Sequence, residues 1–196
     1  MQGGDEMRPP AASKLTYDDF LCFPDDGRRH ELIDGEHYVT PSPATVHQRL
    51  VRLLLVRLND YLQAAGRGEV FCAPLDVVLS NHDVVEPDLL VILHDQQDIL
   101  TEKHVRGAPA IVVEILSPGT RQRDETLKRV LYGRTGVREY WLVDPDRESI
   151  AVCGQGPALE LVDTTTLSAA SGDVLTSALL PGFQLPLPEL FVPPMP

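Results

Sequence analysis

The most regular pattern of apolar and polar positions is helical. Residues 46–66, VHQRLVRLLLVRLNDYLQAAG, place an apolar side chain on one face at every third or fourth position: Leu50, Leu54, Leu58 and Tyr61. Gly66 marks the predicted end of this helix, because glycine readily adopts the left-handed conformation that closes one. LTYDDFLCF, residues 15–23, predicts a second, short helix capped by Thr16.

Continuous and alternating apolar runs predict strands. RRHELIDGEHYV, residues 28–39, predicts two short strands around an Asp34-Gly35 turn. PLDVVLSNHDVVEPDLLVIL, residues 74–93, predicts two strands joined at residues 81–83, with Pro87 at an edge or bulge just before Asp88. AIVVEIL, residues 110–116, is apolar on both faces apart from one glutamate, which predicts a central strand covered on both sides.

The remainder of the chain suggests how these strands connect. A helix is expected from Asp124 to Arg134, with Leu127, Val130 and Leu131 as its apolar stripe, and EYWLVDP (139–145) reads as the next strand. Antiparallel β-structure is expected over residues 149–166, and an irregular, proline-rich strap over residues 179–191.

The order strand, helix, strand favours an α/β fold with a central mixed β-sheet flanked by helices and with additional antiparallel strands. We expect one domain over residues 14–192, between a disordered leader at 1–13 and a tail at 193–196.

Composition narrows the class of protein. The net charge of −12 gives no general attraction to polyanions, although a local basic patch is compatible with an acidic total. Three cysteines far apart in the sequence indicate neither a disulfide framework nor a zinc site. The N-terminus lacks the apolar core of a signal peptide, and no apolar run reaches the length of a membrane span. These features predict a cytoplasmic protein that does not enter a membrane.

Asp88 and Glu114 interrupt the two most apolar predicted strands. A buried carboxylate needs a compensating partner, and two carboxylates on neighbouring strands are hard oxygen ligands suited to Mg²⁺ or Mn²⁺. The helix that follows carries Asp124, Lys128 and Tyr132 at intervals of four, so these side chains share one face, and Lys128 is expected to approach the carboxylates. A metal, two carboxylates and an ammonium suit the hydrolysis of a phosphodiester.

The motifs ELIDGE, EPDLL, VVEILSP, GVREYWLVDP and LPGF occur in the order found in a known family. From about Leu15 to Phe191 the chain resembles the bacterial Uma-two family of endonuclease-like proteins, within the PD-(D/E)XK, or restriction-endonuclease-like, superfamily. The resemblance implies the core of that superfamily, a central β-sheet flanked by helices. It also implies that Asp88 and Glu114 are acidic ligands of the metal ion and that Glu31 is an additional catalytic glutamate. The superfamily's lysine usually lies two residues after the second acid, where this chain has Leu116. Lys128 is therefore expected to be a migrated lysine.

From these residues we expect a metal-dependent DNA endonuclease with Mg²⁺ or Mn²⁺ between Asp88, Glu114 and the main-chain carbonyl of Ile115. Candidates for substrate contacts are Arg121, Arg123, Tyr132, Ser117 and His47. A homodimer is a further expectation. Two other functions stay open: a non-catalytic module that binds nucleic acid or a partner, and a metal-dependent phosphodiesterase that acts on RNA or a small substrate.

Overall fold

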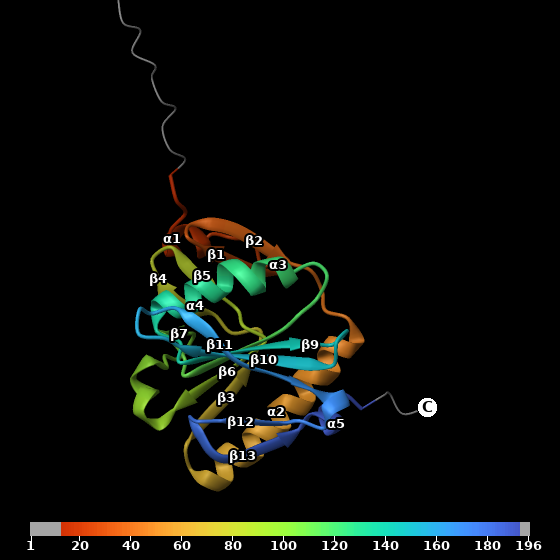
Figure 1. Ribbon diagram of the computed structural model, residues 1–196. Coiled ribbons are helices and arrows are strands. Elements are labelled where there is room, and N and C mark those ends of the chain that lie inside the picture. Colours follow the sequence, from red (N-terminus) through yellow and green to blue (C-terminus); the bar gives the residue numbers. More distant parts are fainter. Residues whose placement is uncertain (1–12, 193–196) are drawn as a thin grey trace, which may run out of the picture.

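The computed structural model describes residues 13–192. The leader expected at residues 1–13, apart from Ser13, and the tail at 193–196 lie outside the described residues. Figure 1 shows a layered α/β arrangement in which a large sheet runs through the middle, with one helix above it and another below. Within residues 13–192, no helix is both long and apolar enough to cross a membrane.

Three sheets are present in the described residues. The six-stranded sheet has the order β11 (Leu161–Ser168), β10 (Ser149–Gln155), β9 (Glu139–Asp144), β8 (Ile111–Ile115), β6 (Leu89–Leu93), β3 (Gly68–Cys72). The five-stranded sheet has the order β2 (Glu36–Thr40), β1 (Arg29–Ile33), β5 (Asp83–Val85), β4 (Val77–Ser80), β7 (Val105–Arg106). The last pairs β12 (Val174–Ser177) with β13 (Leu180–Pro186).

The helical segments connect and cover these sheets. The α-helices are α1 (Tyr17–Phe20), α2 (Thr45–Ala65), α3 (Arg121–Arg123), α4 (Arg129–Thr135) and α5 (Leu187–Leu190). A π-helix, η2 (Asp124–Lys128), joins α3 to α4, and two 3₁₀ turns are η1 (His94–Ile99) and η3 (Ala169–Ser171).

The expected central strand is confirmed. β8 is fully buried and lies between β9, with which it is parallel, and β6, with which it is antiparallel. Side chains alternate across a strand, so Ile111, Val113 and Ile115 join the core between the large sheet and α2. Val112 joins the core on the opposite face. The same alternation directs Glu114 to the opposite face, beneath the η2–α4 helix (Figure 1).

Several local predictions are also confirmed. The Asp34-Gly35 turn joins β1 to β2 with positive φ at both residues, as a two-residue hairpin turn requires. Thr16 caps α1 through its side chain. The long helix buries Leu50, Leu54 and Leu58 and ends at Gly66 in the left-handed conformation.

The prediction of one strand over residues 84–93 is wrong. The chain forms β5, leaves the small sheet at Glu86, and enters the large sheet as β6. Pro87 lacks an amide donor, so the ladder cannot continue through it. The break leaves Asp88 at the junction between the two sheets.

The helix expected at residues 124–134 begins earlier, at Arg121, and contains the π-helical turn at Asp124–Lys128. The predicted apolar stripe is wrong in part, because Leu127 and Val130 are 42% and 67% exposed, whereas Leu131 is buried. Asp124, Lys128 and Tyr132 occupy the buried side instead. The helix therefore turns an ionic face toward the large sheet.

Four strands were not predicted from the sequence: β3, β7, β12 and β13. β3 forms an edge of the large sheet beside β6. The predicted irregular strap contains β13, which pairs with β12. Its side chains Leu180, Phe183 and Leu185 are buried in the core that contacts α2. The side-chain spacing in β13 provides an apolar face that the prolines do not disrupt.

Candidate active site

Asp88 and Glu114 meet because of strand register. β6 and β8 pair antiparallel with Leu89 opposite Val113 and Leu90 opposite Val112. One further step along the same register places Asp88 opposite Glu114, on the face that points away from α2. Residues directly opposite in an antiparallel pair have Cβ atoms about 4.5–5.5 Å apart, so the two carboxylates converge. Both are 3% exposed.

Lys128 forms the centre of a buried ion cluster. Its Nζ lies 2.8 Å from Glu114 Oε1, 2.7 Å from Glu31 Oε1 and 3.7 Å from Asp124 Oδ1. Tyr132 donates its hydroxyl to Glu114 Oε1 at 2.9 Å. Because both bonds to Glu114 use Oε1, Oε2 is the oxygen available to another ligand.

Glu31 is held from several directions. Besides Lys128, it accepts the main-chain N–H of Glu86 on Oε1 at 3.1 Å. Its Oε2 lies 3.3 Å from the guanidinium of Arg123, which also donates to Thr40 Oγ1 at 2.7 Å. The cluster thus joins the hairpin β1–β2 to the π-helical turn and, through Glu114, to the large sheet.

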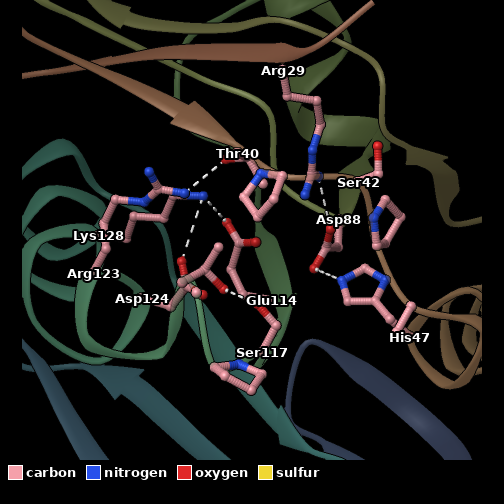
Figure 2. A pocket seen from close by; sticks show the side chains of 16 residues that line it. Arg29, Thr40, Ser42, His47, Asp88, Glu114, Ser117, Arg123, Asp124 and Lys128 are labelled. Atoms are coloured by element: carbon pink, nitrogen blue, oxygen red, sulfur yellow. Dashed lines mark hydrogen bonds and ion pairs between the residues drawn. The ribbon is translucent and has the colours of Figure 1, made fainter.

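Asp88 has a separate set of partners. Arg29 donates to Oδ1 at 2.8 Å, while His47 Nε2 lies 3.0 Å from Oδ2 and the main-chain N–H of Ile115 donates to Oδ2 at 2.8 Å. Figure 2 shows Arg29 and His47 on the Asp88 side and Lys128, Arg123 and Asp124 on the Glu114 side. The two carboxylates are therefore neutralised by different cations.

A pocket of about 200 Å³ opens over this arrangement. Its walls include both carboxylates, Lys128 and the two loops Thr40–Ala44 and Ser117–Thr120 (Figure 2). The pocket is lined by cationic side chains as well as by the acids, so it offers favourable charges to a phosphate group.

The donor set fits a divalent cation. Mg²⁺ prefers oxygen ligands and commonly binds through one or two carboxylates, with waters or phosphate oxygens completing its shell. Asp88 and Glu114 supply two such carboxylates on one pocket wall. Asp124, also on that wall, has a buried Oδ1 without a hydrogen-bond partner in the described part of the chain. The Lys128 ammonium lies 3.7 Å from this oxygen, and a divalent ion in the pocket would stabilise the carboxylate further.

The pKa values of Asp88 and Glu114 are shifted in opposite directions. Burial raises the pKa of Glu114 to about 8, because the Lys128 ammonium offsets only part of the burial and Asp124 adds repulsion. Burial also disfavours ionised Asp88, but His47 and Arg29 outweigh it and hold the pKa of Asp88 at about 2. At neutral pH Asp88 is therefore charged, whereas on Glu114 burial opposes the negative charge and the Lys128 ammonium favours it.

Neighbouring charges also shift the pKa values of Glu31 and Lys128. Burial opposes ionisation of Glu31, yet Lys128 and Arg123 outweigh it, so the pKa of Glu31 lies below its usual value. Burial likewise opposes the Lys128 charge, but Glu114 and Glu31 raise the pKa of Lys128 above its usual value. Lys128 is consequently an ammonium at neutral pH and does not act as a base there.

The remaining predicted site residues divide into three groups. Arg123, Ser117 and His47 line the pocket. Tyr132 is fully buried and donates its hydroxyl to Glu114 from α4. Arg121 is not brought to the pocket, because its guanidinium binds both oxygens of Asp144 at 2.7 and 3.0 Å.

Sequence reasoning missed Arg29 and Thr40. Arg29 lies two residues before Glu31 on β1, so alternation along the strand puts both side chains on one face. Thr40 lies directly opposite Arg29 in the hairpin register. Period-two alternation would have identified both once Glu31 was chosen.

Comparisons with known proteins bear on the family and the fold of this chain. The family model Uma2, described as "Putative restriction endonuclease", matches residues 17–188. A crystal structure described as a putative nuclease belonging to DUF820, from Anabaena variabilis ATCC 29413, superposes with a TM-score of 0.73 at 21% identity, over 90% of this chain and 97% of that chain. No curated protein matches the sequence. The solved structure supports the α/β fold class, and the family match places the chain in the Uma2 family.

Proposed function

We propose that this protein is a metal-dependent endonuclease that hydrolyses phosphodiester bonds of DNA. The observation that carries the proposal is the pair Asp88 and Glu114 on one pocket wall, with the Lys128 ammonium 2.8 Å from Glu114. Membership of the Uma2 family supports nuclease chemistry. Cleavage of both strands of a duplex needs two such sites, which a symmetric homodimer would supply, and we expect that dimer to act in the cytoplasm.

In this proposal Asp88, Glu114 and the main-chain carbonyl of Ile115 would hold Mg²⁺ or Mn²⁺. A divalent ion, when bound, supplies Lewis-acid polarisation of the phosphate and acidifies water. Arg29 and His47 fix the orientation of Asp88, because each binds one of its oxygens. The Ile115 N–H fixes the same carboxylate from the strand.

Lys128 acts through its charge. Its ammonium is held by Glu31 and Glu114, so it stays within reach of a phosphate in the pocket, where negative charge accumulates in the transition state. Arg123 also lines the pocket, and its Nε has no hydrogen-bond partner in the described residues. This N–H group of Arg123 is suited to donate a hydrogen bond to a phosphate oxygen.

We expect the purified protein to nick or cut supercoiled plasmid DNA in Mg²⁺ or Mn²⁺ and to lose this activity in EDTA. Single-stranded DNA, RNA and bis-p-nitrophenyl phosphate, incubated in parallel, test the alternatives. Preferential turnover of RNA or of the small ester would favour the phosphodiesterase. Metal-independent DNA binding without turnover of any substrate would favour the non-catalytic module.

Glu114→Gln tests the metal site without any substrate. The introduced amide keeps an oxygen that accepts from Lys128 and Tyr132, and Lys128 retains Glu31, so the metal-free stability should change by no more than about 1 kcal/mol. Mn²⁺ should raise the melting temperature of the wild type by mass action, and the variant should lose most of that rise.

Glu69→Gln provides the control, because Glu69 is exposed on the edge strand β3 and does not line the pocket. It should keep the wild-type response to Mn²⁺. An equal rise in melting temperature for Glu114→Gln and the wild type would contradict the assignment of Glu114 as a ligand.

A further inference from the structure

A second cleft, of about 490 Å³, continues from the active-site pocket. The two share Arg29, the segment from Thr40 to Pro43, His47 and Asp88. Figure 2 shows three of these shared residues, Arg29, His47 and Asp88, grouped on one side of the active-site pocket. The cleft exceeds the pocket in volume, and it lies in the range of natural small-molecule sites. A chain bound at Asp88 can therefore extend into it.

Glu86 distinguishes this cleft from the metal site. Its side chain lines the cleft but not the pocket, and the residue is only 7% exposed. Oε2 of Glu86 has no hydrogen-bond partner among residues 13–192. His47, which also lines the cleft and is 6% exposed, has an unpartnered Nδ1 in the same part of the chain.

The backbone holds Glu86 firmly in this position. Its N–H donates to Glu31, and its carbonyl accepts from Arg29 at 3.4 Å. A buried carboxyl without hydrogen bonds is destabilising, and sites built to bind a polar ligand contain such groups, which become paired when the ligand arrives. The ligand must then offer hydrogen-bond donors to Glu86.

The other walls define the shape of that ligand. Val51, Pro43 and Pro74 present apolar surface suited to the faces of a flat ring, and Arg28 adds a positive charge at the same cleft. Flat apolar faces, a donor-bearing edge and a neighbouring phosphate describe a nucleotide whose base has left the stack.

We propose that this cleft binds the unpaired base of a nucleotide next to the cleaved phosphate and that Glu86 selects bases with an exocyclic amino group. The inference rests on the proposed nuclease function, because the cleft continues from that site. Cytosine, adenine and guanine can donate an amino hydrogen to the Glu86 carboxyl. Thymine presents one N–H between two carbonyl oxygens, which would face the acidic oxygens of Glu86.

Calorimetric titration of the full chain with dCMP and dTMP in EDTA, at about pH 8.5 so that the Glu86 carboxyl is ionised, tests this selection without cleavage. We expect dCMP to bind about tenfold more tightly than dTMP, since a hydrogen bond to an acidic group is worth about that factor. Glu86→Leu, of similar size, should remove most of the preference while its melting temperature stays at or above the wild-type value. Glu102→Leu, a matched change at an exposed acid outside the cleft, should keep the preference.

The comparison of the two nucleotides on the wild type stands even if a variant fails to fold. Equal affinity for dCMP and dTMP, no saturable binding of either, or an unchanged preference in folded Glu86→Leu would each overturn the base site. Selective dCMP binding by a protein that cleaves no substrate would overturn the nuclease proposal and keep the base site. Metal-dependent cleavage without selective dCMP binding would support the nuclease proposal and overturn the base site.

Discussion

A Lys128→Met variant is expected to lose about 3–5 kcal/mol of folding free energy at pH 8, the cost of leaving buried charges unpaired. Lys128 is 3% exposed and contacts three carboxylates, those of Glu31, Glu114 and Asp124. Methionine fills the same space without the charge. Arg123 continues to compensate Glu31, but no other cation lies within ion-pair distance of Glu114 in the described residues.

The loss should be smaller at acid pH. In the wild type, Lys128 helps to keep the pKa of Glu31 below its usual value, and without the ammonium burial would raise it. The folded variant would then bind more protons than its unfolded chain above about pH 4.5, so its stability rises as the pH falls toward that value. Urea unfolding at pH 8 and pH 5.5 measures both effects.

Lys103→Met is the matched control, because Lys103 is exposed and forms no ion pair with the described residues. It should differ little from the wild type at either pH. Stability of Lys128→Met within about 1 kcal/mol of the wild type at pH 8 would show that the buried cluster does not depend on the ammonium.

Local pattern alone was sufficient for the parts of the fold that set the position of Glu114. The continuous run of valine and isoleucine around it identified a covered central strand, and the structure buries all of β8. The period of residues 46–66 identified α2, which covers one face of that strand. With that face covered by leucines, Glu114 could be accommodated only on the other.

Pattern alone could not show which sheet each segment joins. Residues 84–93 read as one strand, although β5 and β6 belong to different sheets. The partners of a strand are set by packing between distant segments, and only Pro87 gave a local sign of the break. The π-helical turn was equally hidden, because its extra residue per ring leaves no composition signal, and it presents Asp124 and Lys128 to the interior.

Family resemblance supplied what periodicity lacked. Glu31 and Lys128 are 97 positions apart in the numbering of the sequence, yet their charged groups lie 2.7 Å apart. No local rule joins a hairpin residue to a helix residue over that distance. The structure places the Lys128 ammonium between the carboxylates of Glu31 and Glu114, and we propose that it acts as a fixed charge.

Asp88→Asn is expected to lower kcat/KM for metal-dependent cleavage by about 10³-fold or more, since a ligand of the ion supports several kcal/mol of transition-state stabilisation. The change also removes the charge that binds Arg29 and His47, so some stability should be lost as well. A decrease in activity alone would therefore not separate catalysis from folding.

Asp144→Asn separates the two effects. Asp144 is 4% exposed, accepts from Arg121 at 2.7 Å and receives two main-chain N–H groups, much as Asp88 is 3% exposed and binds Arg29 and the Ile115 N–H. Asp144 does not line the pocket. Both variants should lose about 3 kcal/mol of stability, but below its melting temperature Asp144→Asn should retain wild-type kcat/KM and its response to Mn²⁺. Equal activity losses in the two folded variants would mean that Asp88 acts only through the fold.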